Sequence, residues 1–128
     1  MSDIPNDLRY TEEHEYLKSA GDDGLYFVGI TEYAQGELGD VVFVELPESG
    51  SSFNRMEVLG TIEAVKAVSD LYCPVDGTIV EVNAALDDDP SLVNSDPYGR
   101  GWMIKLRVAN DEEVRGLLTS DGYADHVS

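Results

Sequence analysis

The sequence predicts a mainly β protein, a small β-sandwich with short helices on the N-terminal side and at the C-terminus. Short runs of branched and aromatic residues alternate with polar residues, as half-buried strands do, and Gly, Asp and Pro separate the runs. An internal echo indicates two similar units: Gly39-x-Val41-Val42-x-Val44 matches Gly77-x-Ile79-Val80-x-Val82, and a loop and a further strand follow each copy. Such units predict a quasi-twofold sandwich, although chance repetition of a strand-like pattern explains the echo equally well.

The length of the chain and its net charge limit the number of domains and the kinds of partner that we expect. The 128 residues predict one domain, 1–128, with a core over about residues 25–108 and a C-terminal helical segment over about residues 110–127. The net charge of -18 argues against nucleic acids and anionic membranes as partners, because phosphate contacts need clustered Lys and Arg. No apolar run reaches the length of a membrane span, and the first residues resemble no targeting signal. We therefore expect a cytoplasmic monomer.

The N-terminal segment is expected to begin with a helical turn and to lead into a strand. Thr11 is a suitable N-cap, and Glu12 and Glu13 would lie in the first turn, where carboxylates are favoured. Gly and Asp fill residues 21–24, which predicts a hairpin turn. The apolar run over residues 25–30 predicts the strand that this turn would connect.

A short helix and an apolar strand come next. Thr31 is the predicted N-cap of a helix that runs to Leu38, and Gly39 follows in the position that favours a left-handed backbone. Residues 41–46 predict a strand, which a Pro-Glu-Ser-Gly segment ends. The loop after it is polar apart from Phe53, which we expect to pack into the core.

The next two strands predict a hairpin with Lys66 at or near its tip. Along the first strand, residues 58–64, the alternation separates two faces. One face holds Val58, Gly60, Ile62 and Ala64, and the other holds Leu59, Thr61 and Glu63. In the second strand, Leu71 and Cys73 share a face until Pro74 removes a backbone donor and ends the pairing.

The long segment at residues 83–101 carries clustered carboxylates, including those of residues 87–89. Calcium takes several oxygen ligands, so such a cluster is one candidate site for it. The spacing does not match an EF-hand loop, however. A solvated acidic loop is therefore the simpler interpretation of this segment.

The C-terminal part predicts one more strand and a helix. Residues 102–108 alternate between an apolar face, with Trp102, Ile104, Leu106 and Val108, and a solvent face, with Met103, Lys105 and Arg107. Asn110 is the predicted N-cap of a helix that continues to Leu118, with Glu113 in the reciprocal position of a capping box. A final short turn is expected around residues 123–126.

Lys66 differs from the other two lysines of the chain because apolar residues flank it closely on both sides: Ala64, Val65, Ala67 and Val68. An ammonium is rarely buried without a partner, so we expect this side chain to leave the core at the turn, with Glu63 and Asp70 beside it. An ordinary solvated turn lysine is the alternative. The chain has no phosphate-binding loop, no metal-ligand spacing and no nucleophile-base set, so a displayed lysine favours a carrier over an enzyme.

The lysine segment reads Glu63-Ala-Val-Lys66-Ala-Val-Ser-Asp70, and Pro74-Val-x-Gly77 and Val80-Glu-Val-Asn83 follow it. This arrangement resembles the lipoyl-lysine motif of the glycine cleavage system H-protein family. The resemblance covers nearly the whole chain, because it also takes in residues 10–15, 28–35, 38–47, 92–94, 96–99 and 101–105.

The resemblance implies a lipoyl/biotinyl-type barrel-sandwich hybrid fold, with lipoic acid in amide linkage on Lys66. It implies a relay in which the arm receives the aminomethyl group of glycine at the P protein, a pyridoxal-phosphate glycine decarboxylase. The T protein, an aminomethyltransferase, then passes the one-carbon unit to tetrahydrofolate, and the L protein, a dihydrolipoamide dehydrogenase, reoxidises the arm. A lipoate ligase or a lipoyl or octanoyl transferase would attach the cofactor. Thiol chemistry belongs to the cofactor, so the chain itself would supply no catalytic residue and no metal site.

The same resemblance implies a cleft that shelters the loaded arm. The matching positions are Glu15 and Asp70, with Glu13 and His14 alongside them. An ammonium near carboxylates keeps its charge and is a poor leaving group, so loss of ammonia would be slowed. The attachment site is flanked by Glu63, Ala64, Val65 and Ala67, and a neutral arm can lie along the apolar members of this set.

Three positions depart from the residues that are usual in the family. Tyr16 stands in place of Trp, while Ala64 and Cys73 each stand in place of Ser. None of them is the lysine itself. An exposed Cys73 could form mixed disulfides with a reduced arm, whereas a buried thiol would be inert.

Two other functions remain open. The chain could be an H-like relay that donates lipoate to other enzymes, or an unmodified acidic module that binds basic partners or calcium through residues 87–89. Biotin carriers fit less well, because Val65 and Ala67 stand where those proteins place Met. Lipoyl domains of 2-oxo acid dehydrogenases usually have Asp where this chain has Val65.

Overall fold

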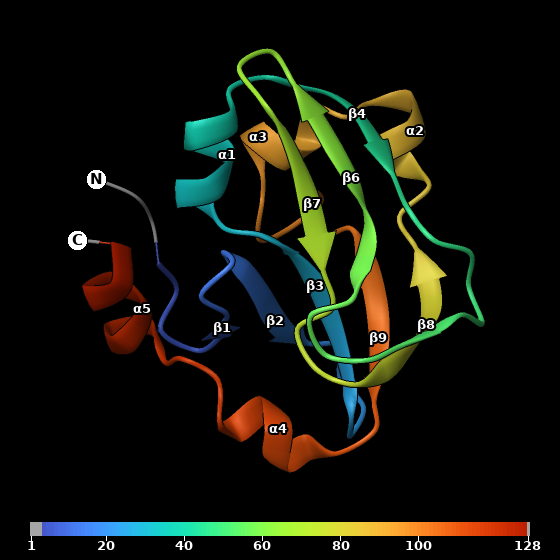
Figure 1. Cartoon of the computed structure of the whole chain (residues 1–128), viewed down its shortest axis with the longest axis vertical. Helices are drawn as coiled ribbons and strands as arrows, with labels where there is room; N and C mark the ends of the chain where they lie inside the picture. Colours follow the sequence, from blue (N-terminus) through green and yellow to red (C-terminus); the bar gives the residue numbers. More distant parts are fainter. Residues whose placement is uncertain (1–3, 128) are drawn as a thin grey trace.

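Two antiparallel sheets packed face to face form the body of the protein, as the mainly β prediction requires (Figure 1). The computed structural model describes residues 4–127, and within them five short helices surround the sheets. The larger sheet has the strand order β1-β2-β3-β9-β8-β5, and the smaller sheet has the order β4-β6-β7. The strands are β1 (Arg9–Tyr10), β2 (Glu15–Ser19), β3 (Leu25–Ile30), β4 (Val41–Glu45), β5 (Ser52–Phe53), β6 (Val58–Ala64), β7 (Val68–Tyr72), β8 (Gly77–Val82) and β9 (Ile104–Val108). The helices are α1 (Glu32–Leu38), α2 (Ala85–Asp88), α3 (Leu92–Ser95), α4 (Asp111–Arg115) and α5 (Ser120–Val127).

The inner faces of the two sheets enclose the main core. Ile62 and Leu71 of the smaller sheet are buried with Val28, Ile79 and Leu106 of the larger sheet in one cluster. Burial of such side chains is the main favourable contribution to folding. No helix within residues 4–127 has both the length and the apolar character needed to cross a bilayer.

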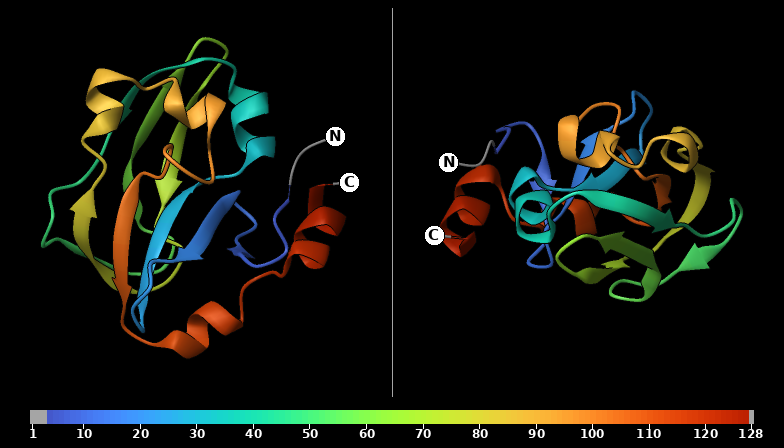
Figure 2. Two further views of the ribbon diagram at one scale, coloured as in Figure 1. Left: turned by 180° about the vertical axis from the view of Figure 1, so that it is seen from behind. Right: turned by 90° about the horizontal axis from the view of Figure 1, so that it is seen from above.

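A second, smaller core joins the N-terminal segment to α5. It consists of Leu8, Tyr10, Tyr16 and Tyr123. The rings of Tyr10 and Tyr123 stack with their centroids 4.8 Å apart. Figure 2 shows α5 lying against the chain around β1, so residues from both ends of the chain are packed together.

The internal echo corresponds to two structurally similar units. β4 pairs with β6 and β8 pairs with β9, both in antiparallel register. The register shifts between Val41 and Phe43 in the first pair and between Ile79 and Glu81 in the second. The extra residue is therefore Val42 in one unit and Val80 in the other, which are matching positions of the echo. The shared position of the bulge favours two similar units over chance repetition of a strand-like pattern.

Several local predictions are confirmed. The turn at residues 21–24 connects β2 to β3, and the hydroxyl of Thr31 caps α1 by accepting the N–H of Ala34. Gly39 ends α1 with φ of 82°. Phe53 is partly buried and packs against the main core.

The helical turn predicted after Thr11 is wrong, because residues 15–19 form β2 instead. The backbone N–H of Thr11 donates to the carbonyl of Glu15, and the N–H of His14 donates to the carbonyl of Thr11. Local capping signals favoured a helix, but β2 pairs with β3 along its whole length and with β1 at Tyr16 and Leu17. These tertiary contacts outweigh the weak local propensity.

The boundaries of the C-terminal helices also differ from the prediction. Asn110 caps α4 as expected, but α4 ends at Arg115 because Leu118 forms a bridge with Tyr10 through two backbone hydrogen bonds. The final turn is a full helix, α5, which buries Tyr123. The bridge from Leu118 to Tyr10 therefore fixes the segment that follows α4, and α5 packs against the N-terminal segment through Tyr123.

The segment 83–101 is more ordered than a solvated loop. It contains α2 and α3, whose apolar side chains Leu86, Leu92 and Val93 are buried in the main core. The carboxylates of residues 87–89 are exposed, as expected. The sequence analysis did not predict α2 and α3, because their few apolar residues lie between acidic residues.

Three side chains, those of Val58, Leu59 and Met103, lie on the opposite face from the one that strict alternation predicts. Leu59 is buried and Val58 is 48% exposed, because the register of β6 and β7 shifts between Val58 and Gly60. Met103 is fully buried although the pattern placed it on the solvent face. It precedes the first residue of β9, so the alternation of that strand does not extend to it.

Candidate functional site

Lys66 lies at the tip of the hairpin between β6 and β7, where the sequence predicts it. Residues 65–67 form the turn, which closes as the N–H of Ala64 donates to the carbonyl of Ala67 at 2.9 Å. The lysine side chain is exposed. Figure 1 shows the hairpin extending to one end of the molecule, beside α1.

The tip is fastened to the segment that joins α1 to β4. The N–H of Val65 donates to the carbonyl of Asp40 at 2.9 Å, and the N–H of Lys66 donates to the carbonyl of Leu38 at 3.1 Å. A Cβ atom at Gly39 would lie 3.1 Å from Cγ of Lys66, so the lysine stem runs over a position that has no side chain. The positive φ of Gly39 favours glycine there for a second reason.

Asn94 in α3 holds the same segment from the other side. Its side-chain amide donates to the carbonyl of Gly39 at 2.9 Å and to the side chain of Gln35 at 2.8 Å. Its side-chain oxygen accepts the N–H of Val41 at 2.8 Å. Residues far apart in the sequence therefore fix the position of the lysine hairpin, which suits a site that must be presented rigidly.

The amine of Lys66 is available for modification. Among residues 4–127 the ion pair found is that of Lys105 with Glu81, at 3.0 Å, and Lys66 takes part in none. Glu63 in β6 and Asp70 in β7 are exposed on the strands beside it. An exposed amine without a carboxylate partner is chemically suited to acylation, so this part of the chain fits an amide-linked cofactor.

A cleft of about 280 Å³ opens between β7, α1 and the turn before β2. Its walls bring together three of the predicted sheltering residues, Glu13, His14 and Asp70. The other lining residues are Ile30, Tyr33, Ala34, Glu37, Leu38 and Ser69. The carbonyl of Leu38 accepts the N–H of Lys66, so the cleft begins at the segment that supports the lysine.

Glu15, the fourth predicted sheltering residue, is buried and does not line this cleft. Its side chain is 1% exposed; one carboxyl oxygen accepts the Thr11 hydroxyl at 2.6 Å and the other accepts the N–H of Tyr72 at 3.3 Å. Burial away from water raises the pKa of Glu15 to about 8, although both hydrogen bonds oppose the shift. The group is therefore mostly protonated at neutral pH.

We expect Glu15 to make the stability of the protein decrease with rising pH. The unfolded chain releases this proton near the ordinary value of 4.5, whereas the folded protein holds it up to about 8. Between these values the folded state binds more protons, so the free energy of unfolding falls as pH rises and levels off above the folded pKa. The fall should amount to a few kcal/mol, since one pKa unit corresponds to about 1.4 kcal/mol.

Urea denaturation of Glu15→Gln at several pH values measures this effect. The amide stays neutral, so the variant should lose most of the decline between the two pKa values. Glu45→Gln is the matched control, because Glu45 is exposed on β4, and its curve should run parallel to that of the unsubstituted chain. Equal pH dependence in all three proteins would contradict the assignment.

His14 joins the cleft to the C-terminal helix. Its Nδ1 lies 2.8 Å from the hydroxyl of Tyr123, which in turn lies 2.7 Å from the hydroxyl of Thr31. Partial burial, followed by the charge of His126, lowers the pKa of His14. Sequence reasoning missed Tyr123 as a support of the cleft. The available signal was an aromatic residue, Tyr123, in an otherwise mostly polar C-terminal segment.

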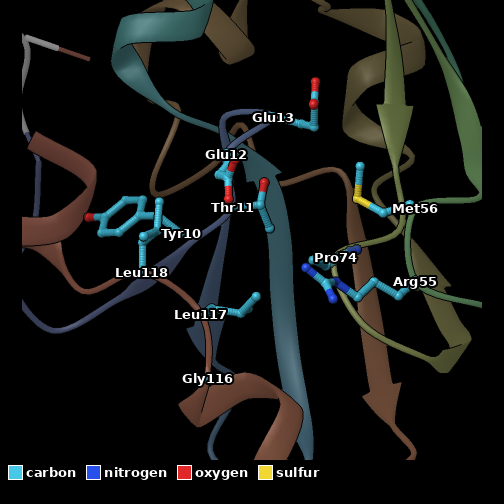
Figure 3. Close-up of a pocket in the computed structure, with 10 residues that line it drawn as sticks. All are labelled: Tyr10, Thr11, Glu12, Glu13, Arg55, Met56, Pro74, Gly116, Leu117 and Leu118. Carbon is cyan, nitrogen blue, oxygen red and sulfur yellow. The ribbon is translucent and has the colours of Figure 1, made fainter. Parts of the chain in front are cut away.

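A second cavity, of about 220 Å³, lies on the other side of Glu13 (Figure 3). Tyr10 and Leu118 stand on one side of it, and Arg55 and Met56 stand on the other. Lys66, His14 and Asp70 do not line it. It is separate from the space next to the hairpin.

Cys73 lies in the core and not on the surface of the hairpin. The thiol of Cys73 is fully buried and donates to the carbonyl of Val75 at 2.9 Å, and burial raises its pKa to about 12. A protonated, buried thiol is inert toward disulfides. Within residues 4–127, no group of three or more His, Cys, Asp or Glu side chains is arranged to hold a metal ion.

Comparison with known proteins identifies the family. A family model described as "Glycine cleavage H-protein" matches residues 8–128. The chain belongs to this family. The glycine cleavage system H protein of Listeria monocytogenes serotype 4a is 52% identical over 120 residues, which is 94% of each chain. That of Alteromonas mediterranea is 50% identical over 127 residues, covering 99% of this chain and 98% of the other.

The fold agrees with that of a solved member of the H-protein family. The crystal structure of a glycine cleavage system H protein from Mycobacterium marinum matches with a TM-score of 0.87 and 44% sequence identity. The match covers 97% of this chain and 98% of the other. The family resemblance and the mainly β sandwich that the sequence predicts are both confirmed.

Proposed function

We propose that this chain is the lipoyl carrier of a glycine cleavage system, with lipoic acid attached to Nζ of Lys66. The observation that carries the proposal is the exposed, unpaired lysine on an anchored hairpin beside a cleft. When bound, lipoic acid supplies a dithiolane that exchanges thiol and disulfide states and accepts a one-carbon unit. The proposed partners are the P protein, the T protein and the L protein, with a lipoate ligase or a lipoyl or octanoyl transferase attaching the cofactor.

The residues of the chain hold and shelter the arm and do no chemistry themselves. Val65 and Ala67 flank the attachment point with apolar surface, along which a neutral amide-linked arm can lie. Leu38 lines the cleft, and its backbone carbonyl also anchors the tip of the lysine hairpin. The protein thus acts as a non-catalytic carrier subunit. A reducing compartment such as the cytoplasm suits it, since a single cysteine forms no internal disulfide.

We assign the charge that meets an ammonium in the cleft to Asp70 and Glu13. Both line the cleft and both are exposed carboxylates. Glu15 is buried and holds its proton to about pH 8, so at neutral pH it supplies a neutral group behind the cleft wall. A carboxylate beside an ammonium keeps it charged, and a charged amine is slow to leave as ammonia.

Asp70→Asn should therefore accelerate the release of ammonia from the glycine-loaded carrier. Removing one surface carboxylate near an ammonium is worth about 1 kcal/mol, which corresponds to an acceleration of roughly fivefold. Single-turnover release of ammonia without tetrahydrofolate measures it. Glu45→Gln is the control, because Thr61 separates Glu45 from Asp70 in the same row of the sheet. Identical rates in both variants would remove Asp70 from the sheltering role.

Two measurements on the unsubstituted chain test the function itself. Intact mass after expression with lipoate should show one lipoyl increment that maps to Lys66, and the modified protein should support glycine-bicarbonate exchange with purified P protein. A modified chain that fails in exchange but donates its lipoyl group to other proteins would be an H-like relay. A chain that stays unmodified and binds calcium tightly would be an acidic interaction module.

A further inference from the structure

The cavity of about 220 Å³ in Figure 3, on the far side of Glu13 from the lysine cleft, is left unused by the proposed function. We propose that it binds a free amino acid with an apolar side chain. Such a ligand is a zwitterion, which carries one carboxylate and one ammonium and has no net charge. We call this space the Arg55 cavity, because Arg55 is the cation that lines it.

Arg55 supplies an unpaired positive charge on one wall of the cavity. Within residues 4–127 the ion pair found joins Lys105 to Glu81, so no carboxylate there neutralises the guanidinium of Arg55. The carboxylate of Asp76 accepts the backbone N–H of Arg55, at 2.6 Å. Figure 3 shows the guanidinium pointing into the cavity, toward the side on which Leu117 stands. A guanidinium in this position is suited to a carboxylate, which it can bind through two N–H groups.

Glu12 supplies a carboxylate on the opposite wall. It is exposed in the turn before β2, and it lines the cavity together with Arg55. In Figure 3, Glu12 and Thr11 stand on the side of Tyr10, across from Arg55. The net charge of the chain is -18, so its field repels a simple anion. A zwitterion avoids this repulsion, since its ammonium can face Glu12 while its carboxylate faces Arg55.

Apolar side chains complete the walls between the two charges. Met56 and Pro74 lie on the side of Arg55, and Leu117 and Leu118 lie opposite them. The volume is smaller than the roughly 300–1,000 Å³ of pockets that hold drug-sized ligands, so the ligand must be small. An aliphatic side chain such as that of free leucine can pack against these residues and leave water, which favours binding.

Backbone contacts hold both walls in place without a ligand. The N–H of Met56 donates to the carbonyl of Cys73 at 2.8 Å, and Leu118 exchanges two backbone hydrogen bonds with Tyr10. Met56 has a φ of 71°, a left-handed conformation that is uncommon for a residue other than glycine. Such strained residues cluster at functional sites, and this one lies next to Arg55.

Titration of the isotopically labelled, unmodified chain with L-leucine, followed by amide chemical shifts, tests the inference. We expect a Kd of about 1 mM, with shifts at residues 10–13, 55–56 and 116–118. The analogue 4-methylpentanoate lacks the ammonium, and 3-methylbutylamine lacks the carboxylate. Each should bind about fivefold more weakly, because each loses one charge contact at an exposed site. Glycine lacks the apolar side chain and should bind about tenfold more weakly.

Two variants assign the charges. Arg55→Gln should raise the Kd for leucine about fivefold without weakening the binding of 3-methylbutylamine, which has no carboxylate. Glu12→Gln should raise it by a similar factor without weakening the binding of 4-methylpentanoate. Arg100→Gln is the matched control, because Arg100 is exposed, does not line the cavity and keeps its backbone contacts with Asp96 and Asn83. Its Kd for leucine should equal that of the unsubstituted chain.

The absence of shifts at leucine concentrations far above this Kd would overturn the inference. Equal affinities for leucine and 4-methylpentanoate would also overturn it, because the site would then bind anions in general. Equal weakening in Arg100→Gln would have the same consequence, since it would trace the effect to net charge instead of the cavity. The titration does not involve modification of Lys66, so a negative result here leaves the proposed carrier function standing.

Discussion

Lys66→Arg should abolish both the lipoyl mass increment and glycine-bicarbonate exchange. Arginine keeps the positive charge and a long stem, but its guanidinium stays protonated and does not act as the nucleophile of amide formation. Lys66 makes no ion pair within residues 4–127, so the free energy of unfolding should change by less than about 0.5 kcal/mol. Intact mass, exchange activity and urea denaturation of the purified variant check the three parts of this prediction.

Lys105→Arg is the matched control for this substitution. Lys105 is the lysine that pairs with Glu81, at 3.0 Å, and its amine lies 5.2 Å from the centre of the Phe27 ring. Arginine can keep both contacts, so this variant should retain the full mass increment and full exchange. A lipoyl increment that survives in Lys66→Arg would place the attachment on Lys18 or Lys105 and would refute the carrier site.

Gly60→Ala should destabilise the fold by about 3 kcal/mol or more, although it adds a single methyl group. A Cβ atom at Gly60 would lie 2.0 Å from the backbone carbonyl oxygen of Glu45. That oxygen belongs to the neighbouring strand, so the methyl group can be accommodated only if β4 moves away from β6. Because β6 also forms one side of the lysine hairpin, the variant should show faster hydrogen exchange at the tip as well.

Gly36→Ala adds the same group at a site where nothing lies within 4 Å of the new atom. Gly36 is exposed within α1, and alanine is the better helix former by about 1 kcal/mol. This variant should be as stable as the unsubstituted chain or more stable. Urea denaturation of both variants measures the contrast, and equal free energies of unfolding would refute the close backbone approach at Gly60.

Local chemistry was sufficient to predict much of the fold and the position of Lys66 at the tip of a hairpin. The Thr31 cap and Gly39 bounded α1, and alternation with terminal glycine or proline located β3, β4 and β7. The hairpin prediction for Lys66 followed because an ammonium between apolar neighbours is stable only where it reaches water. Each of these inferences depends on contacts within a few residues.

The sequence-based predictions were wrong where contacts between distant segments outweigh the local preference for helix or strand. Thr11 was placed at a helix start, yet its hydroxyl and backbone bond to Glu15 in a turn between strands. The end of α4 depended on Leu118 pairing with Tyr10, more than a hundred residues away. No local pattern contains that information.

The residues predicted to shelter the arm show the same difference between what the sequence reveals and what the fold decides. Sequence comparison grouped Glu13, His14, Glu15 and Asp70, but it could not separate the three that line the cleft from the one that is buried. The pKa of Glu15 depends on how much water the surrounding strands exclude, which only the packed structure decides. The support of His14 by Tyr123 likewise required α5 to fold back onto the sheet.

The sequence alone determined that one lysine would stand in water at the tip of a β-hairpin, because that follows from the chemistry of its immediate neighbours. Only the tertiary structure decided what holds that tip in place: the carbonyls of Leu38 and Asp40, and through them the amide of Asn94. The physical reason is that side-chain solvation depends on neighbouring residues, whereas hydrogen bonds across a fold depend on segments that folding brings together.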